Sequence, residues 1–290
     1  MIQFGGGGKS VPQTGRTSRS EGVKPNGGVF LRAIVVELEP GDREYPFSVP
    51  TVASMRRLDT GSPVTFLAGG NGTGKSTVLE AIAHAAGSIP VHGEDERSRE
   101  VMRLVGPLAD RMRLQWSHKT RRGFFLRAED FLDYKRHLLR SMGQLQDISA
   151  RFHEELTGYG RRLAVGAARK EQMALTSRYG EDPDAMSHGE SFLHFFQARF
   201  SGPGLYLLDE PDTALATQSV LGLLAMIKRQ VEAGAQFIIA THNPVLLALQ
   251  GASIISFDRT PPARVDYDEL EQVALMRDFL NHPAAYLRRL

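Results

Sequence analysis

The sequence predicts an α/β fold, in which a mostly parallel sheet is flanked by helices on both faces. Nearly continuous apolar segments of strand length, at 63–67, 205–208 and 236–240, alternate with segments of helical periodicity. Strands that are buried on both faces lose the polar alternation of a half-exposed sheet, so this pattern indicates parallel strands covered by helices. The chain has 290 residues, 41% of them hydrophobic, which suffices for one large domain with an inserted subdomain.

Composition narrows the class of protein. The absence of cysteine excludes disulfides and thiolate metal sites and suits a reducing compartment, so we expect a cytoplasmic protein. No apolar run approaches the ~20 residues of a membrane span, so we expect no membrane insertion by this chain, which should be soluble by itself. The formal net charge of +2 is too small to indicate nucleic-acid binding. Residues 1–28 are rich in Gly, Ser, Lys and Arg and predict a disordered tail.

The elements of the remaining domain, 29–290, are predicted in chain order. Folded structure should start with an edge strand at 29–36. Residues 129–174 have helical spacing and separate two halves of the sheet, so we expect an inserted helical subdomain over about 129–185, too short for a long antiparallel coiled coil. The other predictions are strand 63–67, a helix opening at Thr77, a loop at 87–97, short strands 113–116 and 123–127 around a basic turn, helix 190–199, strand 205–208, helix 218–232, strands 236–240 and 253–257, and helix 270–280.

A phosphate-binding loop follows the strand at 63–67. Residues 69–76 fit the template G-x-x-x-x-G-K-[ST] at every required position and lead into an amphipathic helix, whose N-terminus favours anions. Glycines let several backbone N–H groups point at one phosphate. Lys75 would contact the β- and γ-phosphates, and the Ser76 hydroxyl would bind Mg²⁺. The candidate nucleotide-binding residues are Gly69, Gly70, Asn71, Gly72, Thr73, Gly74, Lys75, Ser76 and Thr77.

Two carboxylates follow the apolar strand at 205–208. Asp209 lies at the carboxyl end of that strand, where open α/β sheets place ligands, and would hold the Mg²⁺ that Ser76 also contacts. Glu210 projects differently and would polarise the attacking water. An acidic pair in this position usually caps a helix or faces solvent, but a phosphate loop in the same chain favours the metal and catalytic roles.

His242 occupies the corresponding place after the strand at 236–240. At that edge it would hydrogen-bond a γ-phosphate oxygen or the attacking water. The alternative is that Thr241 or Asn243 caps the next helix while His242 lies on the surface.

The segment Ser187-His188-Gly189-Glu190 permits two interpretations that are compatible. Ser187 with Glu190 three residues later forms a capping box, which makes a good helix start. The same construction offers free N–H groups, a hydroxyl and the positive end of a helix dipole, so Ser187, Gly189 and Glu190 are candidates for contacting nucleotide.

Together these motifs resemble the ATP-binding-cassette (ABC) ATPases over about 29–257. Residues 69–76 are similar to their Walker A loop, 205–210 to Walker B with its catalytic glutamate, 211–215 to the D-loop, 186–190 to the signature, and His242 to the switch histidine. The Ser-His-Gly-Glu signature, together with Tyr-Pro-Phe at 45–47 and Arg-Asp-Phe-Leu-Asn at 277–281, looks closest to the stand-alone predicted ATPases grouped with the AAA family. The resemblance implies a P-loop NTPase fold of ABC type, with an antiparallel β portion near the N-terminus.

The chain departs from the family pattern at two places. His188 and Glu190 replace the usual glycine and glutamine of the signature. The glutamine that the family has at the end of the strand after Walker A is missing; residues 125–129 occupy that region, and either Arg127 or Glu129 would take its role. Either Tyr45 or Phe47 would stack on adenine, although an aromatic residue beside a proline is as often part of the core.

The resemblance implies Mg²⁺-dependent ATP hydrolysis by two copies facing head to tail, with each ATP between the Walker A loop of one copy and Ser187–Gly189 of the other. Glu210, His242 and Lys75 would be the catalytic residues. We expect ATP-driven dimerisation to act on a macromolecular partner; the alternative is the nucleotide-binding subunit of a membrane transporter. The arginines between Arg97 and Arg136 either contact nucleic acid or form a solvated face.

Overall fold

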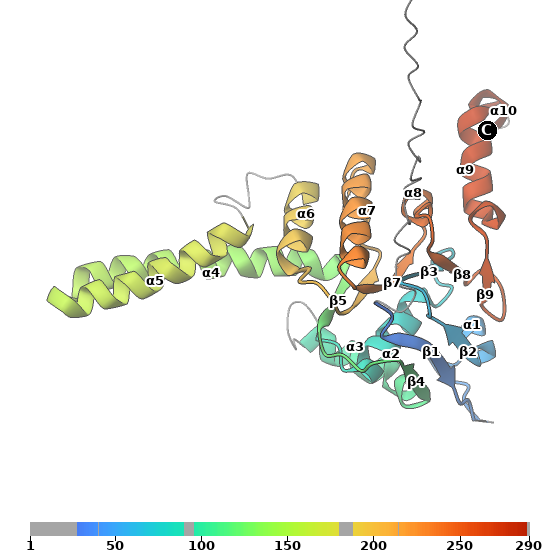
Figure 1. Ribbon diagram of the computed structural model, residues 1–290, viewed down its shortest axis with the longest axis horizontal. Coiled ribbons are helices and arrows are strands. Elements are labelled where there is room, and N and C mark those ends of the chain that lie inside the picture. Colours follow the sequence, from blue (N-terminus) through green and yellow to red (C-terminus); the bar gives the residue numbers. More distant parts are fainter. Residues whose placement is uncertain (1–27, 40, 90–95, 180–187, 214, 289–290) are drawn as a thin grey trace, which may run out of the picture.

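The computed structural model describes residues 28–39, 41–89, 96–179, 188–213 and 215–288. All but the last residue of the predicted tail therefore lies outside the described residues. The predicted α/β fold is confirmed (Figure 1): a six-stranded sheet in the order β5-β6-β7-β3-β8-β9 and a three-stranded sheet in the order β2-β1-β4 organise the molecule. None of the helices in the described ranges has both the length and the apolar character that crossing a membrane requires.

The larger sheet is parallel except at one edge. Its strands are β5 (Gly123–Arg127), β6 (Leu205–Asp209), β7 (Gln236–Thr241), β3 (Val64–Ala68), β8 (Ser253–Ser256) and β9 (Ala263–Val265). The first five run parallel, and β9 pairs antiparallel with β8. All residues of β3, β6, β7 and β8 are buried, which explains why these strands are mostly apolar and lack a regular polar alternation.

The first strand lies at the centre of the smaller sheet and not at its edge. Strand β1 (Leu31–Val36) lies between β2 (Arg57–Asp59) and β4 (Met112–Trp116) and pairs antiparallel with both, so the prediction of an edge strand is wrong. Its partners come from segments remote in sequence, which the local pattern does not reveal. The sheet is antiparallel, as the family resemblance implies, and the two short strands β4 and β5 belong to different sheets.

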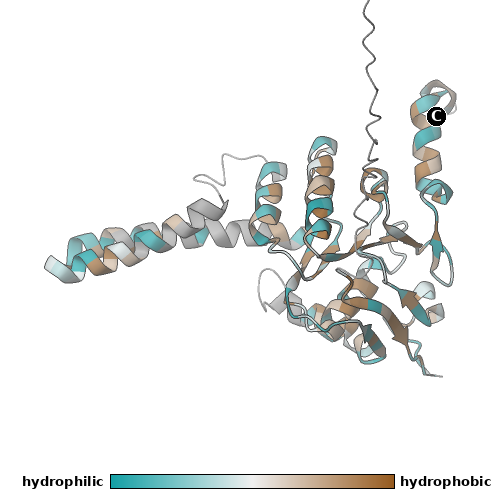
Figure 2. Cartoon of the chain, in the orientation of Figure 1, coloured by the Kyte–Doolittle hydropathy of each residue, from teal (hydrophilic) through white to brown (hydrophobic). Residues whose placement is uncertain are grey.

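Helices cover both faces of the larger sheet and form two hydrophobic clusters (Figure 2). Helices α2 (Lys75–Ala86) and α3 (Glu96–Asp110) lie on one face together with the smaller sheet, and the short helix α1 (Pro50–Ser54) joins this cluster. Helices α6 (His188–Arg199), α7 (Thr217–Glu232) and α8 (Pro244–Leu247) cover the other face. Neighbouring strand residues such as Phe66 and Leu67 belong to opposite clusters, as alternating side chains must.

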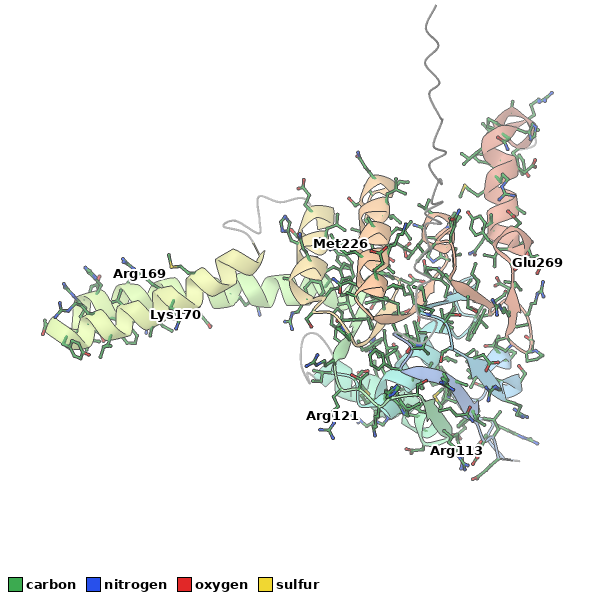
Figure 3. The ribbon with its side chains drawn as sticks, in the orientation of Figure 1. Arg113, Arg121, Arg169, Lys170, Met226 and Glu269 are labelled. Carbon is green, nitrogen blue, oxygen red and sulfur yellow. The ribbon has the colours of Figure 1, made fainter. Side chains whose placement is uncertain are left out.

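Helices α4 (Ala128–Glu155) and α5 (Gly158–Tyr179) form a hairpin that projects from the body (Figure 1). They have 28 and 22 residues and pack along one another, so the expectation that the insert is too short for a long antiparallel pair of helices is wrong. Phe131 fixes the base of this arm, because its ring contacts that of Phe192 in α6 at a centroid distance of 4.4 Å. Arg169 and Lys170 lie far out along it (Figure 3).

The chain ends in a second projection. A 3₁₀ turn, η1 (Tyr267–Glu269), leads into α9 (Glu271–Asn281) and the short α10 (Pro283–Leu287). Leu270 and Val273 are buried against the main core, and the rest of α9 rises from the edge strand β9 (Figure 1).

A single buried amide joins the two sheets. Gln236, at the start of β7, is fully buried. Its Oε1 accepts hydrogen bonds from the backbone N–H groups of Phe30 and Leu31, each at 2.8 Å. Its Nε2 donates to the carbonyl oxygens of Leu31 at 2.8 Å and Thr60 at 2.7 Å. The side chain thus satisfies backbone groups of the smaller sheet at the point where the two sheets meet.

We predict that Gln236→Leu lowers the free energy of unfolding by about 3–5 kcal/mol, because buried donors and acceptors that lose their partners cost roughly 1–3 kcal/mol each. Chemical denaturation measures this change. Gln115→Leu, at an exposed glutamine of the smaller sheet, is the control and should change stability by less than about 0.5 kcal/mol. Equal effects of the two substitutions would contradict the bridging role.

Candidate nucleotide-binding site

The loop between β3 and α2 has the geometry of an anion site. Gly74 caps α2 in the left-handed region, with φ of 94°, and a Cβ there would lie 2.9 Å from Thr51 Oγ1. Only glycine fits this position without strain. Because the capping residue has no side chain, α2 begins without the acceptor that normally takes the first amide hydrogens of a helix. An anion is the natural substitute.

Lys75 lies beneath this loop and is buried. Its Nζ donates to the carbonyl oxygens of Gly69 at 2.8 Å and Gly70 at 2.7 Å. Burial lowers the pKa of Lys75, and the carboxylates of Glu210, Asp209 and Asp258 oppose that shift. The lysine is therefore held inside the loop, where it would help to bind phosphate.

Asp258 is a residue of the site that the sequence analysis missed. Its Oδ1 accepts a hydrogen bond from the backbone N–H of Gly70 at 2.8 Å, which fixes the start of the phosphate loop. Asp258 follows β8, the strand beside β3. An acidic residue at the carboxyl end of a predicted parallel strand was the available signal.

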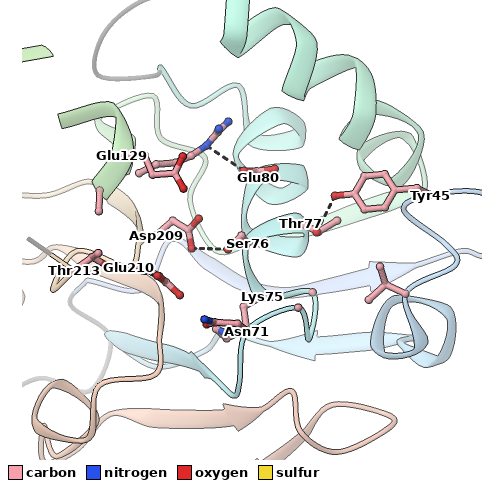
Figure 4. Close-up of a pocket in the computed structure, with 15 residues that line it drawn as sticks. Tyr45, Asn71, Lys75, Ser76, Thr77, Glu80, Glu129, Asp209, Glu210 and Thr213 are labelled. Carbon is pink, nitrogen blue, oxygen red and sulfur yellow. Dashed lines mark hydrogen bonds and ion pairs between the residues drawn. The ribbon is translucent and has the colours of Figure 1, made fainter. Parts of the chain in front are cut away.

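The two predicted metal ligands meet directly. Ser76 Oγ donates to Asp209 Oδ1 at 3.0 Å (Figure 4). Burial raises the pKa of Asp209 to about 7, with repulsion from Glu80 and Glu210 adding to the increase and the bond from Ser76 opposing it. A buried carboxylate beside a hydroxyl, with other carboxylates close by, favours a hard divalent cation that would keep it ionised. The donor set thus fits Mg²⁺, with Ser76 and Asp209 as the residues that would hold it.

Glu210 and His242 form a pair at the carboxyl ends of β6 and β7. Glu210 adopts a left-handed backbone, with φ of 46°, a conformation that non-glycine residues rarely adopt outside functional sites. Its Oε1 lies 3.3 Å from His242 Nδ1. Asn243 does cap α8, accepting from the N–H of Val245 at 2.9 Å, so capping and the placement of His242 beside Glu210 occur together.

A cleft of about 500 Å³ lies over the phosphate loop and the end of β6 (Figure 4), and His242 borders it through Glu210 without lining it. Asn71, Gly72, Gly74, Thr77 and Tyr45 line it together with Lys75, Ser76, Asp209, Glu210 and Thr213. Tyr45 Oη lies 3.0 Å from Thr77 Oγ1, whereas Phe47 is buried in the core. The geometry therefore favours Tyr45 over Phe47 as the aromatic neighbour of a bound base.

Both candidates for the role of the missing glutamine also line the cleft. Arg127 ends β5 directly opposite Asp209 in the sheet, and its Nε lies 3.1 Å from Glu80 Oε1. Glu129 is the second residue of α4 and also lines the cleft. The structure places both near the predicted metal ligands without selecting one of them.

Three of the arginines between Arg97 and Arg136 form ion pairs with carboxylates in the described ranges. Arg111 pairs with Glu39 and Asp42, Arg113 with Glu37, and Arg127 with Glu80. Arg113 and Arg121 lie on the side of the smaller sheet (Figure 3). This pairing is typical of a solvated or structural role.

The described part of the signature segment, residues 188–190, is absent from the described lining of this chain's cleft. Ser187 lies outside the described residues. Helix α6 begins at His188, and neither Gly189 nor Glu190 is among the described residues that line the cleft. The chain thus assembles Lys75, Ser76, Asp209 and Glu210 at one place and leaves the start of α6 elsewhere.

The pKa of Asp209 leads to a stability prediction. Because the folded-state pKa of Asp209 is about 7, above the usual 3.8, its ionisation lowers stability: the cost is absent below about pH 4, grows between pH 4 and 7, and is complete above pH 7. Asp209→Asn should therefore raise the free energy of unfolding in EDTA by roughly 1–4 kcal/mol at pH 8 and by much less at pH 5. Denaturant titrations at both pH values measure it; a difference independent of pH would contradict the assigned burial cost.

Comparison with known proteins places this geometry in a family. The profile of the family described as "ABC transporter" matches residues 60–213, just over half of the chain. A curated relative, the macrolide export ATP-binding/permease protein MacB of Bordetella avium, is 26% identical over 219 residues, which are 72% of this chain and 30% of that protein. A probable export ATP-binding/permease protein of Pseudomonas fluorescens is 23% identical over 253 residues, or 82% of this chain and 35% of that protein.

This chain thus spans about a third of the length of the curated relatives it matches. Among solved structures, cbiO1 from Clostridium perfringens, described as part of the ABC transporter complex cbiONQ, aligns with 90% of this chain and 100% of its own, with a TM-score of 0.41 and 16% identity. The profile match covers the phosphate loop, both strand-end carboxylates and the segment that joins them. This chain belongs to the ABC transporter family, and within it is an ATP-hydrolysing domain.

Proposed function

We propose that two copies of this chain close head to tail around ATP and hydrolyse it in composite sites. One copy would contribute Lys75, Ser76, Asp209, Glu210 and His242, and the other the segment Ser187–Glu190. The observation that carries this proposal is the separation within one chain between the cleft and the start of α6, which is absent from the cleft lining. A helix start supplies the amide donors and the positive dipole end that a γ-phosphate requires.

The loop, the two carboxylates after β6 and His242 each have a chemical task in this proposal. The loop amides and Lys75 bind and orient the phosphates, and Tyr45 flanks the base. Glu210 accepts a proton from the attacking water, while His242, 3.3 Å away, fixes the orientation of that carboxylate and donates to the terminal phosphate. Mg²⁺, when bound by Ser76 and Asp209, neutralises charge on the phosphate oxygens. Since ATP is the substrate, we expect the domain to work in the cytoplasm.

We predict that Glu210→Gln retains ATP binding, slows hydrolysis about 10²- to 10⁴-fold, and accumulates an ATP-dependent dimer. The amide keeps the shape of the side chain but cannot accept the proton. Phosphate release assays and sedimentation velocity with and without ATP measure the two effects. Turnover at the wild-type rate would remove Glu210 from the mechanism, and a monomer at saturating ATP would contradict the composite site.

Two candidates remain for what the ATP cycle drives. The relatives favour a transporter, because both curated matches are named as export ATP-binding/permease proteins. The comparisons support this transporter function better than the other candidate. In a transporter, the opening and closing of the dimer would move a membrane-spanning partner. The sequence analysis gave priority to a macromolecule outside the membrane. The long α4–α5 arm is the observation that favours the second candidate, because it carries exposed Arg161, Arg162, Arg169 and Lys170 well away from the body.

Capture with the Glu210→Gln protein distinguishes these candidates. The tagged variant, loaded with ATP in cells, should retain its partner because the dimer does not reopen. We expect an integral membrane protein in detergent extracts if the domain drives transport, and a partner of the soluble fraction if it does not. Substitution of Arg161, Arg162, Arg169 and Lys170 by serine is the matched test, since only the second candidate predicts that the partner is then lost.

A further inference from the structure

An apolar groove of about 630 Å³ lies beside the nucleotide cleft and has no role in the proposal above. One wall is the C-terminal projection, with Leu275, Met276 and Phe279 of α9 and Tyr286 of α10. The other wall is formed by Asn71 of the phosphate loop and His242. The groove therefore joins an apolar helix face to two elements of the predicted catalytic centre.

The helix wall of this groove is apolar, exposed and ordered. Gln272, Leu275, Met276 and Phe279 follow the i, i+3, i+4, i+7 spacing of one helix face, yet Leu275 is 56% and Met276 46% exposed. In the described part of the chain, α9 packs mainly on η1 and α10. A face of this kind is normally covered in the functional state.

The projection is also rigid enough to present that face. Its base is held by buried Val273 and by Tyr267, whose hydroxyl donates to the carbonyl oxygen of Pro244 at 3.0 Å. Its end is fastened by Tyr286, which stacks edge-on against Phe279 at 5.5 Å and donates to Asp278 Oδ2 at 2.6 Å. The apolar face is thus positioned before any partner binds, which lowers the cost of ordering on association.

The groove is continuous with the surface that closes over ATP. Asn71 lines both the nucleotide cleft and the groove, and His242 lines the groove while contacting Glu210. A copy that covers the phosphate loop therefore also reaches the mouth of the groove. We infer that the α9 groove is a docking surface for the second copy of this chain, engaged when the nucleotide site closes. This inference rests on the proposed head-to-tail dimer and extends it beyond the ATP contacts.

In this arrangement the apolar contact supplies dimer affinity that nucleotide alone does not. Each copy contributes one groove, so a two-fold dimer buries two such faces, one beside each ATP. The contact also covers His242, which lines the groove.

The test compares two charge substitutions in the Glu210→Gln background, where ATP holds the dimer closed. Leu275→Asp places a carboxylate in the groove, while Leu163→Asp does the same at a leucine of α5 with nearly the same exposure, 57%. Both side chains are exposed, so both variants should fold. We expect Leu275→Asp to weaken ATP-dependent dimerisation at least about tenfold in sedimentation velocity, because a buried unpaired charge is costly at an interface centre.

Binding of a fluorescent ATP analogue to the monomer should be unchanged in both variants, and Leu163→Asp should dimerise like the parent. An unaltered dimer in Leu275→Asp would overturn the inference while leaving the proposed function intact. If the Glu210→Gln parent itself stays monomeric with ATP, the composite site and the docking surface both fail. The two failures are therefore distinguishable.

The lack of cysteine gives a second, independent readout. Met276→Cys labelled with a benzophenone maleimide should form a photo-crosslinked dimer in the presence of ATP and not in its absence. The same label at Leu163→Cys should give no dimer. Equal crosslinking at both positions would overturn the docking surface.

Discussion

The hydrogen bond between Ser76 and Asp209 depends on the register of three parallel strands, and the rest of the site depends on it. Ala240 of β7 pairs with Leu67 of β3 on one side and with Asp209 of β6 on the other. The two outer strands therefore end within one residue of the same level, and the residues that follow them meet across the end of β7. A shift of one residue in either pairing would turn Asp209 away from the loop and bury a different face.

The same register explains how the other side chains reach the cleft. Arg127 pairs with Asp209 from the opposite side of β6, and Thr241 at the end of β7 donates to Asp212 at 2.8 Å, which holds the segment after Glu210. Gln236 fixes the other end of β7 to the smaller sheet. The central strand is thus anchored at both ends, and the catalytic edge is rigid where positioning matters.

The sequence predicted those parts of the fold that are encoded locally. Buried parallel strands have unbroken apolar runs, and the phosphate loop is a contiguous motif with fixed spacing, so both were predicted at the correct positions. Strand β1 was misjudged because its central place depends on β2 and β4, which lie far along the chain. Helix α3 begins near the end of the predicted loop at 87–97 and was not predicted, because Pro107 and a run of charged residues obscure its periodicity. Asp258 was missed because a single acidic residue after a strand has meaning only once β8 is known to flank β3.

The central claim is that each nucleotide site needs residues from two copies, and mixing two inactive variants tests it most directly. Lys75→Ala removes the phosphate-binding lysine, and Ser187→Arg blocks the signature segment that would face the other copy. In a mixed dimer, one site carries both defects and the other carries neither. We expect each variant alone to be inactive and an equal mixture to recover about a quarter of wild-type ATP turnover. A mixture as inactive as its components would contradict a site shared between copies.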